Sequence, residues 1–209
     1  MKQLFFSFIF LIISNTYAFQ DTAIVLIDMQ DKFFERSNNQ DTEEVKELVA
    51  NNKTVLEWGV KNDLPILIFE YDGYGPTTDK LLDVYADHDH KTVIKYRDGG
   101  FARETDSRSE AIQFLVNRHV KNLIILGING PYCVKSTVRG ALAAGYEVYT
   151  ASDIVADVNP HPPTFPDSDW WLTEEAFHSY ENYVELIEFF EDKYSVESSA
   201  HLASADSNN

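Results

Sequence analysis

The chain contains a single cysteine and few basic residues. One cysteine among 209 residues cannot form an internal disulfide, so a disulfide-stapled fold is excluded. Lys and Arg number 17 against 34 Asp and Glu, which gives a formal net charge of −17. Such a chain repels nucleic acid and anionic membranes, and we expect neither as a partner. No strand-like segment is followed by a glycine-rich phosphate loop, so the sequence offers no nucleotide-binding motif.

The first 18 residues have the pattern of a secretory signal. Lys2 precedes a ten-residue apolar run at 4–13, and small residues follow at Thr16 and Ala18. The run is shorter than the ~20 residues that span a bilayer. We expect cleavage after Ala18 and a secreted or periplasmic protein, with a buried N-terminal strand or an uncleaved anchor as the alternatives. The remainder reads as one domain over 19–203 and a disordered polar tail over 204–209.

Strand-like and helix-like segments alternate along the rest of the chain. Continuous apolar runs are typical of strands buried on both faces of a parallel sheet. This alternation predicts an α/β fold, a three-layer α/β/α sandwich around an open, mostly parallel sheet of six strands. The expected strands are 22–27, 64–69, 92–95, 122–127, 146–151 and, more weakly, 194–197; the expected helices are 42–61, 81–85, 106–119, 134–144 and 173–193.

Three chemically active residues follow predicted strands. Asp28 ends the first strand, Lys95 ends the third, and Cys133 lies in the loop after the fourth. Each has an ordinary structural interpretation: a turn cap, a solvated edge lysine and a core thiol. Because the carboxyl ends of parallel strands share one edge, the three are expected to meet there. A helix N-terminus after Pro131 and the charge of Lys95 would favour the thiolate, and Asp28 could accept its proton.

These residues and their surroundings resemble the isochorismatase-like cysteine hydrolase superfamily. The matching segments are 24–30, with Asp28, Met29 and Gln30; Phe33; Lys95 and Phe101; Gly127 to Thr137; and 145–153. The resemblance implies an Asp28–Lys95–Cys133 triad that hydrolyses small carboxamides through a thioester. It also implies a cis peptide at Ile128–Asn129 and an oxyanion hole formed by the backbone N–H groups of Asn129 and Cys133.

The sequence offers candidate residues for a substrate pocket but no matching motif for a metal site. Phe33, Glu70, Phe101 and Tyr132 are the candidate lining residues of a small, mostly apolar pocket. Nicotinamidases of the superfamily bind a divalent ion through an Asp-x-His motif, and the stretch 70–74 has no histidine. His88 and His90 are interpreted as a solvated turn. We therefore expect no metal, no other cofactor and no nicotinamidase activity.

The resulting hypothesis is an exported, metal-independent cysteine hydrolase of small amides that acts as a homo-oligomer. Two alternatives stay open. Pro131 in the cysteine loop has no N–H, which leaves room for a non-catalytic binding protein on the same fold. An isochorismatase-type hydrolase of vinyl ethers is the other, although such enzymes lack the nucleophilic cysteine.

The signal-peptide prediction can be tested on protein from the native host. The mature chain should begin at Phe19. N-terminal sequencing that finds Met1 on soluble protein would contradict it.

Overall fold

The computed structural model has a three-layer α/β/α architecture, as the sequence predicts. It describes residue 19 and the ranges 21–103, 105–166 and 174–206, with side chains as far as residue 195. The expected signal peptide therefore lies outside the described residues. No helix within these ranges is long and apolar enough to cross a membrane.

A seven-stranded parallel sheet forms the middle layer. Its continuous path has the order β3-β2-β1-β4-β5-β7, and the two-residue β6 pairs with β4. The strands are β1 (Thr22–Ile27), β2 (Ile66–Tyr71), β3 (His90–Lys95), β4 (Asn122–Ile128), β5 (Glu147–Ala151), β6 (Val155–Ala156) and β7 (Phe177–Tyr180). The central strands β1 and β4 are buried along their whole length, which explains their continuous apolar sequences.

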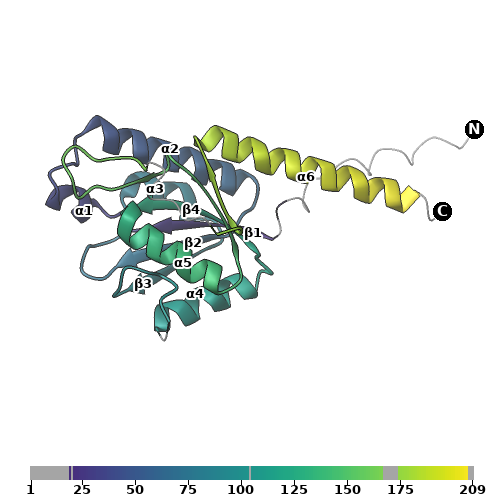
Figure 1. Cartoon of the computed structure of the whole chain (residues 1–209), viewed down its shortest axis with the longest axis horizontal. Coiled ribbons are helices and arrows are strands. Elements are labelled where there is room, and N and C mark those ends of the chain that lie inside the picture. Colours follow the sequence, from purple (N-terminus) through teal and green to yellow (C-terminus); the bar gives the residue numbers. More distant parts are fainter. Residues whose placement is uncertain (1–18, 20, 104, 167–173, 207–209) are drawn as a thin grey trace, which may run out of the picture.

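Helices cover both faces of the sheet (Figure 1). On one side lie α2 (Glu43–Lys61), α3 (Asp79–Tyr85) and α6 (Tyr183–Asp206), and on the other α4 (Asp106–Val116) and α5 (Lys135–Ala143). The chain changes side where it crosses from β3 back to β4, as right-handed connections require. The strand order therefore reverses between β1 and β4, and sites in such sheets form beyond the carboxyl ends at this point.

The C-terminal third departs from the predicted element types. The expected helix over 173–193 is instead strand β7 followed by α6, and the expected strand over 194–197 lies inside that helix. Aromatic residues favour a strand in Phe177–Tyr180, which pairs with β5. Asn182 then ends this segment by accepting a hydrogen bond from the Glu185 N–H at 3.0 Å, an N-cap contact that starts α6.

Helix α6 is held by a contact with the start of β1. The Tyr194 hydroxyl lies 2.7 Å from Asp21 Oδ1 and 2.7 Å from the Thr22 hydroxyl. Residues 204–206, which sequence analysis assigned to a disordered tail, continue this helix. Two further helices carry site residues: α1 (Asp31–Arg36), which was not expected from the sequence, and the single-turn π-helix η1 (Gly130–Val134).

Candidate active site

A buried ion pair joins the ends of two strands. Lys95 Nζ lies 2.8 Å from Asp28 Oδ2, and both side chains have an exposed fraction of 0%. Strand β2 separates β1 from β3, so the Lys95 side chain crosses the end of β2 to reach Asp28. It also donates a hydrogen bond to the Arg97 carbonyl at 3.2 Å and lies 4.4 Å from the centre of the Tyr71 ring. The solvated-lysine interpretation of Lys95 is therefore excluded, and its charge is compensated inside the protein.

Cys133 lies beside this ion pair in η1. The π-helix follows β4 directly and has Pro131 in its first turn, where the absent N–H costs no helical hydrogen bond. The N–H groups of Tyr132 and Val134 both donate to the Asn129 carbonyl at 3.1 Å. The Thr137 hydroxyl donates to the Cys133 carbonyl at 2.7 Å and so fixes the cysteine against α5. The thiol is free and 4% exposed.

Burial sets the protonation of Asp28 and Cys133. Desolvation raises the pKa of Asp28 to about 6, although the Lys95 charge and a hydrogen bond from the Cys133 thiol lower it. Desolvation, and next the charge of Asp28, raises the pKa of the Cys133 thiol to about 12, with Lys95 opposing. The expectation that the thiolate is favoured at rest is therefore wrong, because burial outweighs the attraction of Lys95. At neutral pH the thiol is protonated and donates to the Asp28 carboxylate.

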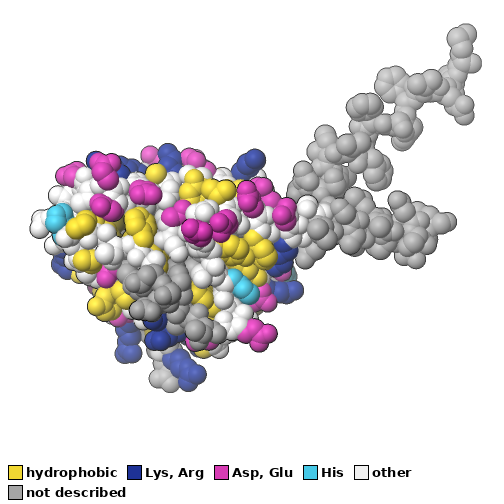
Figure 2. Space-filling model, turned by 45° about the horizontal axis from the view of Figure 1, so that its top comes forward, with side chains coloured by type: hydrophobic (Ala, Val, Ile, Leu, Met, Phe, Trp, Pro, Cys, Tyr) yellow, Lys and Arg dark blue, Asp and Glu magenta, His cyan; other side chains and the backbone are white. Residues whose placement is uncertain are grey.

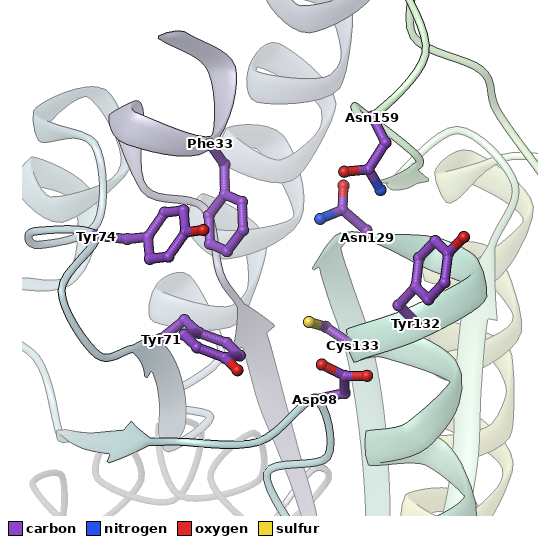
Figure 3. Close-up of a pocket in the computed structure, with 8 residues that line it drawn as sticks. All are labelled: Phe33, Tyr71, Tyr74, Asp98, Asn129, Tyr132, Cys133 and Asn159. Atoms are coloured by element: carbon purple, nitrogen blue, oxygen red, sulfur yellow. The ribbon is translucent and has the colours of Figure 1, made fainter. Parts of the chain in front are cut away.

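Aromatic rings form much of the wall of a cavity of about 350 Å³ in front of Cys133 (Figure 3). Phe33 comes from α1, Tyr71 ends β2, Tyr74 lies in the following loop, and Tyr132 precedes the cysteine. The Phe33 and Tyr74 rings stack with centroids 4.0 Å apart. Tyr132 is 54% exposed and stands at the rim. The predicted pocket residues Phe33 and Tyr132 thus line the cavity.

Three polar residues complete the lining. These are Asp98, Asn129 and Asn159. The Val158 N–H donates to Asn129 Oδ1 at 3.0 Å, so the amide nitrogen of Asn129 is turned toward the cavity (Figure 3). The Ile128–Asn129 peptide bond is cis, as the resemblance implies.

Two predicted pocket residues lie elsewhere. Phe101 is 1% exposed and packs edge-to-face on Phe69 with centroids 5.3 Å apart, so it belongs to the core. The Glu70 carboxylate accepts hydrogen bonds from the Thr77 N–H at 2.7 Å and the Thr77 hydroxyl at 3.0 Å. Side chains alternate along a strand, and Glu70 therefore points to the loop it anchors while Tyr71 points to the cavity.

The sequence analysis missed four lining residues: Tyr71, Tyr74, Asp98 and Asn159. Gln30 holds Tyr71 and the loop next to Tyr74, because its side-chain oxygen accepts from the Tyr71 N–H at 2.8 Å and its side-chain nitrogen donates to the carbonyls of Tyr71 and Gly75. The available signal was position: Tyr71 ends β2 and Tyr74 follows it, at the same sheet edge as Asp28.

The two histidines proposed as a solvated turn are more ordered than expected. His88 Nε2 lies 2.7 Å from the Leu64 carbonyl, and His90, the first residue of β3, contacts the His88 carbonyl at 2.9 Å. Both are partly buried at the amino end of the sheet, opposite Cys133. In the part of the chain that the structure describes, no three His, Cys, Asp or Glu side chains are grouped so as to hold a metal ion.

Comparison with known proteins places the chain in a family. The model of the Isochorismatase domain matches residues 22–165. The chain is 22% identical over 142 residues to isochorismatase family protein 2A of Dictyostelium discoideum, covering 66% of this chain and 68% of that protein. Since the family model covers well over half of the chain, the protein belongs to the isochorismatase family.

Solved structures share the fold. N-carbamoylsarcosine amidase from Thermoplasma acidophilum superposes with a TM-score of 0.60 at 17% identity, covering 76% of this chain and 95% of that one. The YcaC protein of Escherichia coli, an octameric hydrolase of unknown specificity, superposes with a TM-score of 0.59 at 14% identity, covering 91% of this chain and 96% of that one. These likenesses confirm the predicted fold class.

The buried ion pair predicts a large effect of Lys95→Met on stability. The variant leaves the Asp28 carboxylate buried and unpaired, which should lower the free energy of unfolding at pH 7 by ~3–5 kcal/mol. The loss should shrink at acid pH, where Asp28 is protonated, and in the double variant Asp28→Asn/Lys95→Met. Urea unfolding at pH 5 and pH 8 measures it.

The matched control for this prediction is Lys91→Met. Lys91 lies on the same strand, and its ion pair with Glu110 is about half exposed at 3.0 Å. Its loss should cost less than ~1 kcal/mol. Equal effects of the two substitutions would contradict a stabilising role of the buried pair.

Proposed function

We propose that the protein is a cysteine hydrolase that cleaves small carboxamide-like substrates with an Asp28–Lys95–Cys133 triad. The observation that carries the proposal is the fully buried Asp28–Lys95 pair beside a thiol that faces a small cavity. A thiol, a base and a buried cation at one point are the groups that acyl transfer needs. Membership of a family with hydrolases among its structural relatives supports the same activity.

The reaction begins with general-base catalysis. Asp28 takes the thiol proton as the Cys133 sulfur bonds to the substrate carbonyl carbon. The carbonyl oxygen becomes an oxyanion, and the backbone N–H groups of Asn129 and Cys133 are the proposed donors to it. Asp28 then gives its proton to the leaving nitrogen, the C–N bond breaks, and an amine or ammonia leaves behind a thioester.

Hydrolysis of the thioester uses the same groups in reverse. Asp28 accepts a proton from water, the resulting hydroxide adds to the thioester carbonyl, and the C–S bond breaks. The Cys133 sulfur recovers its proton from Asp28, which restores the resting state. Lys95 remains charged throughout and stabilises whichever neighbour carries the negative charge, Asp28 at rest or Cys133 during attack. No step needs a metal, because the chain supplies nucleophile, base and oxyanion donors.

Export and assembly complete the proposal. The N-terminal pattern supports cleavage after Ala18 and a secreted or periplasmic location. The octameric state of the E. coli structural relative supports a homo-oligomer. The raised thiol pKa is compatible with a non-catalytic binding protein too. Turnover therefore separates the two functions, whereas alkylation of the resting thiol does not.

Substitution of the nucleophile tests the covalent mechanism. Wild-type protein should release ammonia from at least one member of a panel of small amides, ureides and carbamoyl compounds. Cys133→Ala should abolish that release, and Cys133→Ser should lower it almost as far, because Asp28 cannot efficiently deprotonate a hydroxyl. Mass spectrometry of the wild-type chain under turnover should detect the acyl adduct. Wild-type rates from Cys133→Ala would exclude the mechanism.

The pH profile tests the role of Asp28. The base must be ionised, and its pKa is about 6. kcat/KM should therefore fall about tenfold per pH unit below pH 6 and level off above it. Asp28→Asn should lower the plateau by ~10²-fold or more and remove this dependence. If kcat/KM of Asp28→Asn fell below pH 6 in the same way as in the wild type, the titrating group would be another residue.

A further inference from the structure

The charge of the cavity is unbalanced. Asp98 is the one charged residue among the described side chains that line it, and its carboxylate lies next to Cys133 (Figure 3). Asp98 is exposed, and within the described ranges it has no hydrogen bond or ion pair. A carboxylate beside a nucleophile that must become an anion is unfavourable by itself. Water solvates this exposed carboxylate in the free protein, so a ligand that enters the cavity meets an uncompensated negative charge.

The loop that carries Asp98 is held firmly against α5. The Gly100 N–H donates to the Thr137 hydroxyl at 3.0 Å, and that hydroxyl also binds the Cys133 carbonyl. Gly99 approaches the Ser136 carbonyl so closely that a Cβ would lie 3.1 Å from its oxygen. One side chain, Thr137, thus links the Asp98 loop to the cysteine. The carboxylate is presented to the cavity by the same contacts that position the nucleophile.

Two cations near the cavity, Lys95 and Arg36, are already engaged. Lys95 is paired with Asp28, and the Arg36 guanidinium covers the Tyr74 ring at 4.3 Å from its centre. Phe33 stacks on that ring and lies on its cavity side (Figure 3). Neither cation lines the cavity. An aromatic surface and an unpaired carboxylate together attract a positively charged ligand.

We propose that the substrate carries a positively charged nitrogen within a few bonds of the scissile carbonyl, bound by Asp98 and the aromatic wall at Phe33 and Tyr71. This deepens the proposed hydrolase function and rests on it. Substrates with a carboxylate in that place are disfavoured. The surface charge also favours a cationic ligand. Many acidic side chains lie across the face in Figure 2, and the chain has a formal net charge of −17. Net negative charge favours cations over anions among the small molecules that approach a protein.

A bound cation would also assist the chemistry. The charge of Asp98 raises the pKa of both Asp28 and Cys133. The other charged groups at this point, Asp28 and Lys95, already compensate one another. A cation on Asp98 removes the remaining repulsion and makes the thiolate easier to form. Cationic substrates should therefore have a higher kcat as well as a lower KM.

A pair of isosteric amides tests the inference. Betaine amide has a quaternary nitrogen where 3,3-dimethylbutanamide has a carbon, so the two differ in charge and hardly in shape. Wild-type protein should prefer betaine amide in kcat/KM by about tenfold or more, a typical effect of a favourable local field. Asp98→Asn should remove most of that preference. Asp87→Asn is the control, because Asp87 is exposed at the amino end of β3 and the net charge changes equally.

A second measurement does not depend on hydrolysis. Cys133 is the only cysteine, so intact mass reports its modification by methanethiosulfonates. The trimethylammonium-ethyl reagent should react faster than the sulfonatoethyl reagent, and Asp98→Asn should reduce this ratio where Asp87→Asn does not. Hydrolysis without charge preference, with equal ratios in all variants, would overturn the inference and leave the hydrolase standing. Charge-selective modification without any amide turnover would instead contradict the proposed function and retain the cationic site.

Discussion

The buried contact between Asp28 and Lys95 is the constraint on which the rest of the site depends. Two opposite charges can be buried together because each compensates the other. Loss of either one leaves an unpaired buried charge, which lowers the free energy of unfolding. Lys95 must cross the end of β2 to make the contact, so the pairing of β2 with β1 and with β3 has to bring Asp28 and Lys95 to the same end of the sheet. The register of the sheet therefore also sets the position of the Asp28 carboxylate.

The same ion pair influences the protonation of the Cys133 thiol. Burial and, next, the charge of the neighbouring Asp28 carboxylate raise the pKa of Cys133 to about 12, so the carboxylate does not ionise the thiol at rest. The resting site is a neutral thiol hydrogen-bonded to a carboxylate that a lysine holds charged. In the proposed mechanism the thiolate forms only as the sulfur attacks the substrate. Protection of the resting thiol from side reactions is a consequence.

The cavity walls depend on a few buried polar contacts from the loops. Gln30 fixes the backbone at Tyr71 and Gly75, Glu70 fixes Thr77, and Thr137 joins the Asp98 loop to the cysteine turn. Each is a side chain that satisfies backbone groups which the loops leave unpaired. The lining of the cavity can therefore change at Tyr74, Asp98 or Tyr132 while Asp28, Lys95 and Cys133 remain in place.

The sequence by itself determined the α/β class, the central strands and the three residues at their ends, because buried parallel strands are continuous apolar runs and their carboxyl ends meet at one edge. It misassigned Phe177–Tyr180 as helix and 194–197 as strand, since the β5 partner and the Asp21 contact that decide them are distant in the chain. Only the tertiary structure placed Glu70 and Phe101 outside the cavity and brought Tyr71 and Asp98 into it. It also reversed the expected shift in the thiol pKa, because desolvation depends on everything packed around a group and not on its neighbours in sequence.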